Sequence, residues 1–308
     1  MYYRPKLLIV TLINLFIVTM TFTFSRSYAA EEPAIGPDPM ADVYVFGLGL
    51  GLGVGGAVSW KYQENYTGKF TVLHEGWFGP DTYAGGADKI GHFYTDFVLV
   101  RAVNQIYLKH GYGEDAAIWR SFLASTAIRT LMEVADGYTT FKYSPEDLIA
   151  NIAGGLSSAV LLKYPALDDA LGFSWTYLPS REKLEGKVDW PSIDNDYNGS
   201  IYHFDMRLKG LRSLLGISGI EAFDLYNVSL SYMTRGYDRE RALKQRILGL
   251  TIGLNLPELL TPDAGTDSEL GLAAGVLKYF KVPFSFGGLT YDLDHQRYGF
   301  RFGLNYFY

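Results

Sequence analysis

Residues 246–256 read RILGLTIGLNL. Leucine or isoleucine occupies every second position from Leu248 to Leu256, and a small or polar residue lies between each pair. A period of two with one apolar face predicts a half-buried antiparallel strand. The same pattern recurs elsewhere in the C-terminal third of the chain, where we expect further strands near residues 199–210, 226–235, 282–292 and 297–308.

The remaining face of these strands carries small or polar residues, which is also typical of strands in outer-membrane barrels. Five strands are too few for a bacterial barrel, which needs at least about eight. Two alternatives follow. Either further strands lie within residues 43–72 and the sheet is barrel-like, or the sheet is open and covered by helices, with residues 268–280 as one cover helix. In both alternatives we expect the sheet to face a membrane.

The middle of the chain has a helical pattern over residues 87–110, 114–137 and 144–162. Ser144 precedes Pro145, and Asp147 follows in the first turn, which is typical of a helix N-terminus. Ionised residues such as Arg101 and Glu133 disfavour plain membrane spans. Glycine alternates with Leu or Val from Gly47 to Gly55, which fits either a strand or a closely packed helix. The predicted fold class is therefore α+β, a bundle of three or more helices followed by an antiparallel sheet.

The first 29 residues have the pattern of a signal peptide, with Arg4 and Lys6 before an apolar run and Ala29 at the cleavage position. The apolar run is also long enough to be a retained membrane anchor. The predicted divisions are a signal peptide (1–29), a tether (30–40), a helical domain (41–163), an irregular linker (164–198) and a β-rich region (199–308). Export fits the envelope of a Gram-negative bacterium, in the periplasm or at the outer membrane.

Composition excludes several classes of protein. The 308 residues are 48% hydrophobic and 19% charged, so the chain can bury enough apolar surface to fold. A formal net charge of −6 argues against nucleic acid as a partner. The sequence has no cysteine, which excludes disulfides, cysteine-based metal sites and a lipid-modified cysteine.

Polar residues recur at helical spacing in the predicted bundle, so that the members of each pair share one helix face. If the helices pack together, these residues converge on one site. The predicted site consists of Asp88, Lys89, His92, Glu133, Asp136, Asp147 and Asn151.

Three interpretations of this site remain open. It can be a satisfied polar network that fixes how the helices pack. It can bind a divalent metal through His92, Glu133 and Asp136, because one imidazole and several carboxylates suit a hard or borderline cation. It can instead recognise an anionic lipid head group through Lys89.

Three motifs carry a resemblance to a known family. They are Thr82–Phe93 with its D-K-x-G-H core, Glu133-x-x-Asp136-Gly137, and Ser144-x-x-Asp147-x-x-x-Asn151-x-x-Gly154. Together with Glu75–Phe78 they resemble the YfiM family of exported bacterial envelope proteins, and their order is distantly similar to VanZ-like membrane proteins. The resemblance implies an envelope location and a polar helical core, but no established reaction. Smaller members are often lipoproteins, so this chain, without cysteine, is expected to attach differently.

These observations together predict a structural or interacting component at the periplasmic face of the outer membrane. The expected partners are membrane lipid or other outer-membrane components. The alternative is a metal-dependent hydrolase that acts on an envelope lipid or a cell-wall precursor, with Glu133 or Asp136 as general base for a metal-bound water.

Overall fold

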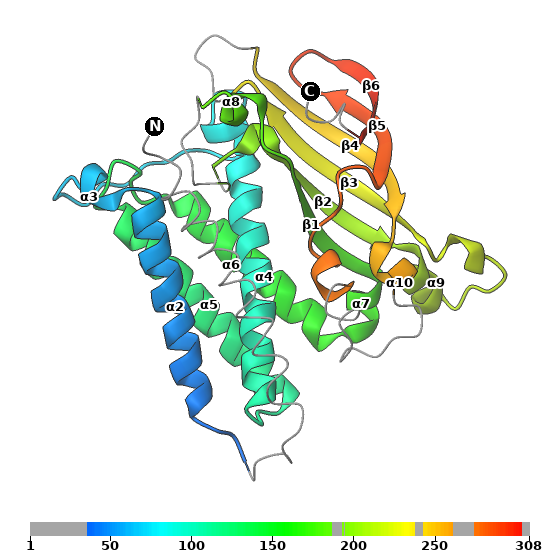
Figure 1. Cartoon of the computed structure of the whole chain (residues 1–308), viewed down its shortest axis with the longest axis horizontal. Coiled ribbons are helices and arrows are strands. Elements are labelled where there is room, and N and C mark those ends of the chain that lie inside the picture. Colours follow the sequence, from blue (N-terminus) through cyan, green and yellow to red (C-terminus); the bar gives the residue numbers. More distant parts are fainter. Residues whose placement is uncertain (1–35, 187–192, 194, 238–242, 261–273, 304–308) are drawn as a thin grey trace. The chain divides into compact units, whose positions relative to one another are not determined.

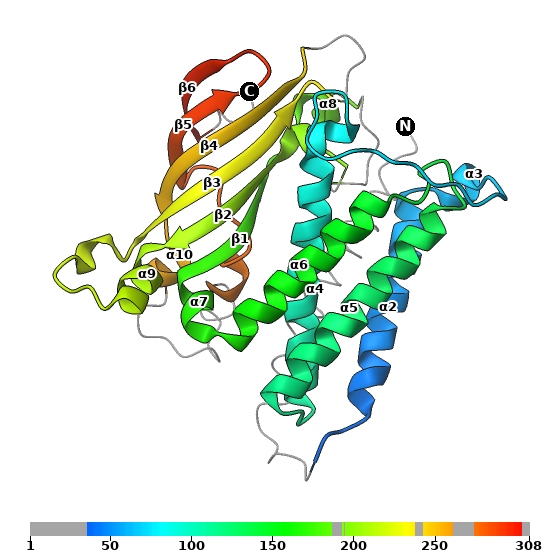
Figure 2. The same ribbon diagram turned by 180° about the vertical axis from the view of Figure 1, so that it is seen from behind.

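A computed structural model describes residues 36–186, 193, 195–237, 243–260 and 274–303 (Figures 1 and 2). The described chain divides into two compact units. The helical unit contains residues 36–75 and 95–163, and the sheet unit contains residues 76–94 and the described residues from 164 onward. The predicted α+β fold is confirmed. The predicted signal peptide and most of the tether lie outside the described residues.

Four long helices account for most of residues 36–163. They are α2 (Met40–Ser59), α4 (Ala87–Lys109), α5 (Glu114–Asp136) and α6 (Pro145–Lys163), with the short α3 (Tyr62–Asn65) after α2. The last three match the predicted helices to within one or two residues. The glycine-rich segment forms a helix, so the alternative of barrel strands within residues 43–72 is wrong.

Glycine allows α2 to approach α5 closely. A Cβ atom added at Gly49 would lie 2.9 Å from Cγ1 of Ile128 on α5. The N-terminus of α6 is capped as its sequence predicts, because the backbone N–H of Asp147 donates to Oγ of Ser144 over 3.3 Å. Among the described helices, α2 alone is long and apolar enough to cross a membrane by length and composition, with a mean hydropathy of 1.5.

The helical unit buries polar groups and exposes large apolar ones. Its apolar core includes Ala41, Val45 and Val103. Polar residues are buried as well, among them Asp96, Asn104, Ser121, Ser125 and Asn151. The outward surface carries Phe46, Leu123, Leu131, Ile149 and Leu156, all of them exposed.

The sheet unit contains six antiparallel strands in the order β1-β2-β3-β4-β5-β6, so each strand pairs with its neighbour in the sequence (Figure 1). They are β1 (Leu171–Tyr177), β2 (Ser200–Arg207), β3 (Tyr226–Arg235), β4 (Gln245–Leu254), β5 (Phe286–Asp292) and β6 (Arg297–Phe302). The five predicted strands correspond to β2–β6. Among the described residues the sheet is open, since β1 does not pair with β6.

Residues 164–198 are not the irregular linker that we expected. Their described part contains α7 (Pro165–Ala170), β1, α8 (Arg181–Leu184) and the start of η2 (Tyr197–Gly199). The period of two in β1 is short and lies between prolines, which explains why the sequence alone did not reveal it. Further short elements are η1 (Tyr83–Gly86), α9 (Leu208–Leu215), η3 (Glu221–Phe223) and α10 (Leu256–Leu260). Of the predicted cover helix 268–280, residues 274–277 form one helical turn, and residues 268–273 lie outside the described residues.

The two faces of the sheet have opposite chemistry. One row across the strands pairs Phe204 with Leu230, Leu230 with Leu250 and Leu250 with Leu289. We call the exposed part of this side the apolar face, and its members are Leu230, Leu250, Ile252, Leu289, Phe300 and Phe302. Over β1 the same side is covered by the start of α4 (residues 87–94), where the rings of Phe93 and Phe173 lie 4.7 Å apart.

The other side, the polar face, is buried around an ion pair between two distant residues. Nζ of Lys281 lies 2.5 Å from Oδ1 of Asp205, and both side chains are 4% exposed. Lys281 also donates to Oγ of Ser229 over 2.7 Å. The hydroxyls of Ser174 and Ser229 donate to Asp205. The carboxylate and the ammonium are therefore both satisfied without water.

The polar face also holds a neutral histidine. His203 is 2% exposed, its Nδ1 lies 2.7 Å from Oγ of Ser231, and its Nε2 lies 3.0 Å from Oγ1 of Thr176. Burial and the nearby Lys281 hold the pKa of His203 well below its usual range. Burial raises the pKa of Asp205, but Lys281, His203 and the serine hydroxyl outweigh it, so the net shift is downward.

Replacement of Lys281 by methionine should destabilise the protein by about 3–5 kcal/mol, because it leaves the buried Asp205 carboxylate without its counter-ion. The free energy of unfolding, measured with urea near pH 7, tests this expectation. Lys244→Met is the matched control, since Lys244 is exposed in the same unit. Equal stability of the two variants would mean that the pair is not buried as described.

Stability should fall as the pH drops below about 6.5, because His203 is protonated in the unfolded chain but stays neutral in the folded one. The loss approaches about 1.4 kcal/mol per pH unit in this window. Unfolding free energies between pH 7.5 and 5 should show a smaller slope for His203→Gln than for the wild type. Equal slopes in the two proteins would contradict a buried, neutral His203.

Candidate functional site

The predicted site begins at the N-terminus of α4, where the backbone is shaped by two glycines. Gly85 and Gly86 have φ values of +63° and +86°. A Cβ atom at Gly86 would lie 2.4 Å from the carbonyl oxygen of Trp77, so glycine is required there. This turn starts α4 and places Asp88 in its first turn, where the helix dipole favours a negative charge.

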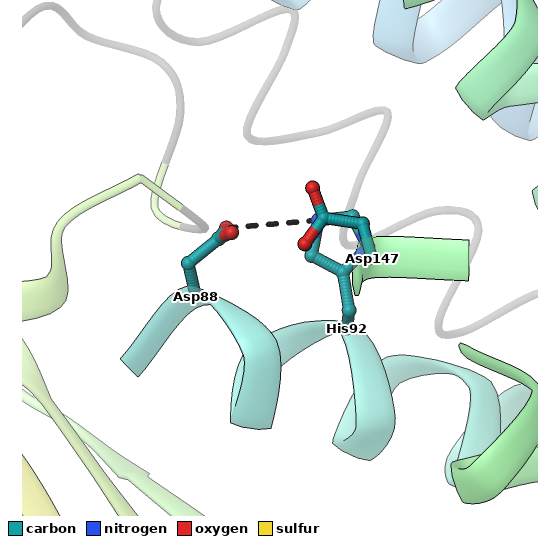
Figure 3. Close-up of side chains that lie close together, drawn as sticks. All are labelled: Asp88, His92 and Asp147. Atoms are coloured by element: carbon teal, nitrogen blue, oxygen red, sulfur yellow. Dashed lines mark ion pairs between the residues drawn. The ribbon is translucent and has the colours of Figure 1, made fainter. Parts of the chain in front are cut away.

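Asp88 is the centre of a compact buried cluster in the sheet unit. Nζ of Lys89 lies 2.8 Å from Oδ2 of Asp88, and the hydroxyl of Tyr197 donates to Oδ1. Nε2 of His92, one helical turn further on, lies 3.6 Å from Oδ1 of Asp88 (Figure 3). The side chains of Lys89 and Asp88 are 2% and 6% exposed, whereas that of His92 is 20% exposed.

The charge of the Asp88 carboxylate is stabilised by its neighbours within this cluster. Burial raises the pKa of Asp88, but His92 and Lys89, with the hydroxyl of Tyr197, outweigh it and lower the pKa below its usual value. Burial and the neighbouring carboxylate raise the pKa of Tyr197 well above its ordinary range. Asp88 is therefore a carboxylate near neutral pH, and Tyr197 is a neutral donor to it.

A second part of the predicted site lies in the helical unit, on α5 and α6. Nδ2 of Asn151 donates to Oε1 of Glu133 over 3.2 Å, and Nε of Arg129 donates to Oδ1 of Asn151 over 3.4 Å. Glu133 is 3% exposed and Asn151 is fully buried. Asp136 accepts a hydrogen bond from the hydroxyl of Tyr62. Burial and Asp136 together raise the pKa of Tyr62 above its ordinary value.

The seven predicted residues are therefore distributed over both units. Asp88, Lys89 and His92 form one group, and Glu133 with Asn151 forms another. Asp147, also drawn in Figure 3, comes from α6 in the helical unit and is held by the cap of that helix. The convergence of all seven on one site stays a prediction.

The first group supplies two metal ligands at most, a carboxylate of Asp88 and a ring nitrogen of His92. Their i,i+4 spacing on one helix suits a shared cation. The ammonium of Lys89 already occupies one side of the carboxylate and opposes a second cation there.

Sequence reasoning did not find the Asp205–Lys281 pair or the partners of His203. Their residues lie on four different segments, and the pair itself is separated by 76 positions. A signal was present, because Asp205 and His203 occupy the non-apolar positions of a strand with period two. His203 itself has a hydrogen-bonding partner at each ring nitrogen.

Comparison with known proteins connects part of this chain to the cell envelope. Residues 74–163 match a family described as predicted periplasmic lipoproteins (DUF2279). No curated protein and no solved structure matches the chain. The finer resemblance to YfiM and VanZ-like proteins is not confirmed. Since the match contains all seven predicted site residues and ends at α6, the chain is similar over that region to an uncharacterised exported envelope family.

Proposed function

We propose that this protein is a structural or interacting component of the cell envelope, held at the periplasmic face of the outer membrane by contact between lipid and the apolar face of its sheet. The observation that carries the proposal is the exposure of that face. Its six side chains range from 51% exposed at Leu230 to 70% at Phe300. Large contiguous apolar patches on a protein surface mark contact sites.

The composition of this side of the sheet favours lipid over a protein partner. Of the strand positions that share this side on β3–β6, only Arg246, near the start of β4, carries a charge, and it is paired with Asp294. Tyr291 and Tyr298, which pair across β5 and β6, lie in the row beside the leucines. Tyrosines beside an apolar band are typical of surfaces at a membrane–water interface.

The family match supports the location, since it points to export to the envelope. The partners that we propose are membrane lipid or other outer-membrane components, and the acidic net charge argues against nucleic acid. The chain has no cysteine for lipid modification, so an apolar protein surface is a suitable means of attachment.

The absence of cysteine allows a direct test, because a single introduced cysteine can carry an environment-sensitive fluorophore. In the variant Leu289→Cys the label should shift to shorter wavelength when the full chain is mixed with vesicles of phosphatidylethanolamine and phosphatidylglycerol. It should also become protected from an aqueous quencher, because the apolar face then lies in lipid.

The matched control is Leu243→Cys, at a side chain that is 79% exposed and lies outside the apolar face. Its label should stay in water. A Leu289 label that stays as accessible as the Leu243 label in the presence of bound vesicles would overturn the proposed contact.

A metal-dependent hydrolase is the second candidate. It is favoured by one observation, the ionised Asp88 within 3.6 Å of the partly exposed His92 on the same helix face. In this candidate Glu133 or Asp136 would act as general base for a metal-bound water, and the substrate would be an envelope lipid or a cell-wall precursor.

Elemental analysis of the purified full chain separates the two candidates. If Asp88 and His92 belong to a packing network, the protein contains no stoichiometric metal. His92→Ala then lowers the melting temperature by about 2–4 °C, as expected for about 1 kcal/mol in a chain of this size. One equivalent of metal that is lost in both His92→Ala and Glu133→Ala would contradict the packing network and support the enzyme.

A further inference from the structure

The helical unit contains an apolar groove that the proposed lipid contact of the sheet does not involve. The groove has a volume of about 580 Å³ and lies between α2 and α5. Its lining on α2 recurs every three or four residues from Asp42 to Trp60, so one face of that helix forms a wall. Opposite this wall lie Ile128 and Leu131 of α5.

Glycines determine where the groove is open. The two helices come together at Gly49, beside Ile128, and at Gly56, where an added Cβ would lie 3.3 Å from Cε of Met132. Gly53 lies between these two points and lines the groove. A Cβ atom added at Gly53 would meet no other atom within 4 Å. The missing side chain at Gly53 therefore leaves the space that makes the groove continuous.

The dimensions of the groove select the kind of occupant. The lining from Asp42 to Trp60 spans about 27 Å at the rise of an α-helix, and most of the residues along it are apolar. A single extended hydrocarbon chain, one methylene wide, fits along the length of the groove.

One end of the groove has charge suited to a head group. Arg120 is 49% exposed there, lies 3.5 Å from Asp42, and its guanidinium lies 4.8 Å from the ring centroid of Tyr112. A guanidinium carries five N–H donors and can bind Asp42 and a further anion together. From the shape of the groove and this cation we infer that it binds one acyl chain of a lipid with an anionic head group.

The test uses the full chain held in an amphipathic polymer and the fluorescence of Trp60, which lines the groove. Dibromostearate should quench Trp60 in a saturable manner, because bromine quenches tryptophan at short range, and Trp60→Phe should remove this component. Gly53→Leu should weaken the binding at least tenfold, because the new side chain fills the groove.

The matched control is Gly51→Leu, a change of the same kind on the same helix at an exposed position with no atom within 4 Å of the added Cβ. It should bind as the wild type does. Equal affinity of the Gly53 and Gly51 variants, or the absence of saturable quenching in the wild type, would overturn the inference.

Two further measurements test the cation at the mouth of the groove and the source of the acyl chain. Arg120→Gln leaves the groove wall unchanged and should weaken dibromostearate binding severalfold, whereas an unchanged affinity would refute the role of the cation at the mouth. Vesicles of brominated phosphatidylglycerol distinguish a membrane lipid from a free fatty acid. If these vesicles quench Trp60 as strongly in Gly53→Leu as in Gly51→Leu, the quenching comes from contact with the bilayer and not from lipid in the groove.

Discussion

The ion pair between Asp205 and Lys281 determines how the sheet can be arranged. A carboxylate and an ammonium can be buried only if hydrogen-bond donors and acceptors surround them, since a buried charge without partners costs several kcal/mol. The strand positions around Asp205 on its side of the sheet are accordingly polar or small, among them Gly172, Ser174, His203 and Ser229. Because successive residues of a strand point to opposite sides, this choice sends side chains such as Leu230, Leu250 and Phe300 to the other side.

The helical unit also buries polar residues and exposes apolar ones, although it contains no strand. Buried Asp96 and Asn151 lie inside that unit, while Phe46 and Leu123 lie at its surface. A protein that is surrounded only by water gains its stability by the opposite arrangement. The same arrangement in two units that are built differently supports the proposed contact with lipid. This is a stronger argument for lipid than either exposed surface by itself.

The fold class could be predicted from the sequence because it depends on local periodicity. The period of two in β4 and the capping pattern at Ser144 are properties of short segments, and both were confirmed. Long-range pairing could not be predicted, since nothing near Asp205 indicates that Lys281 is its partner. The strand β1 was missed for a related reason, because its seven residues are recognisable as a strand only beside β2.

In the predicted site, too, contacts within one helix could be predicted and contacts between distant segments could not. Helical spacing correctly placed His92 one turn from Asp88, and it could not foresee that Lys89 and Tyr197 would also bind that carboxylate. These two partners change the chemistry that the site can perform. A carboxylate that already has an ammonium at 2.8 Å binds a divalent cation only by displacing it or by sharing its charge. A metal at Asp88 therefore requires more negative ligand charge than a bare aspartate–histidine pair would need.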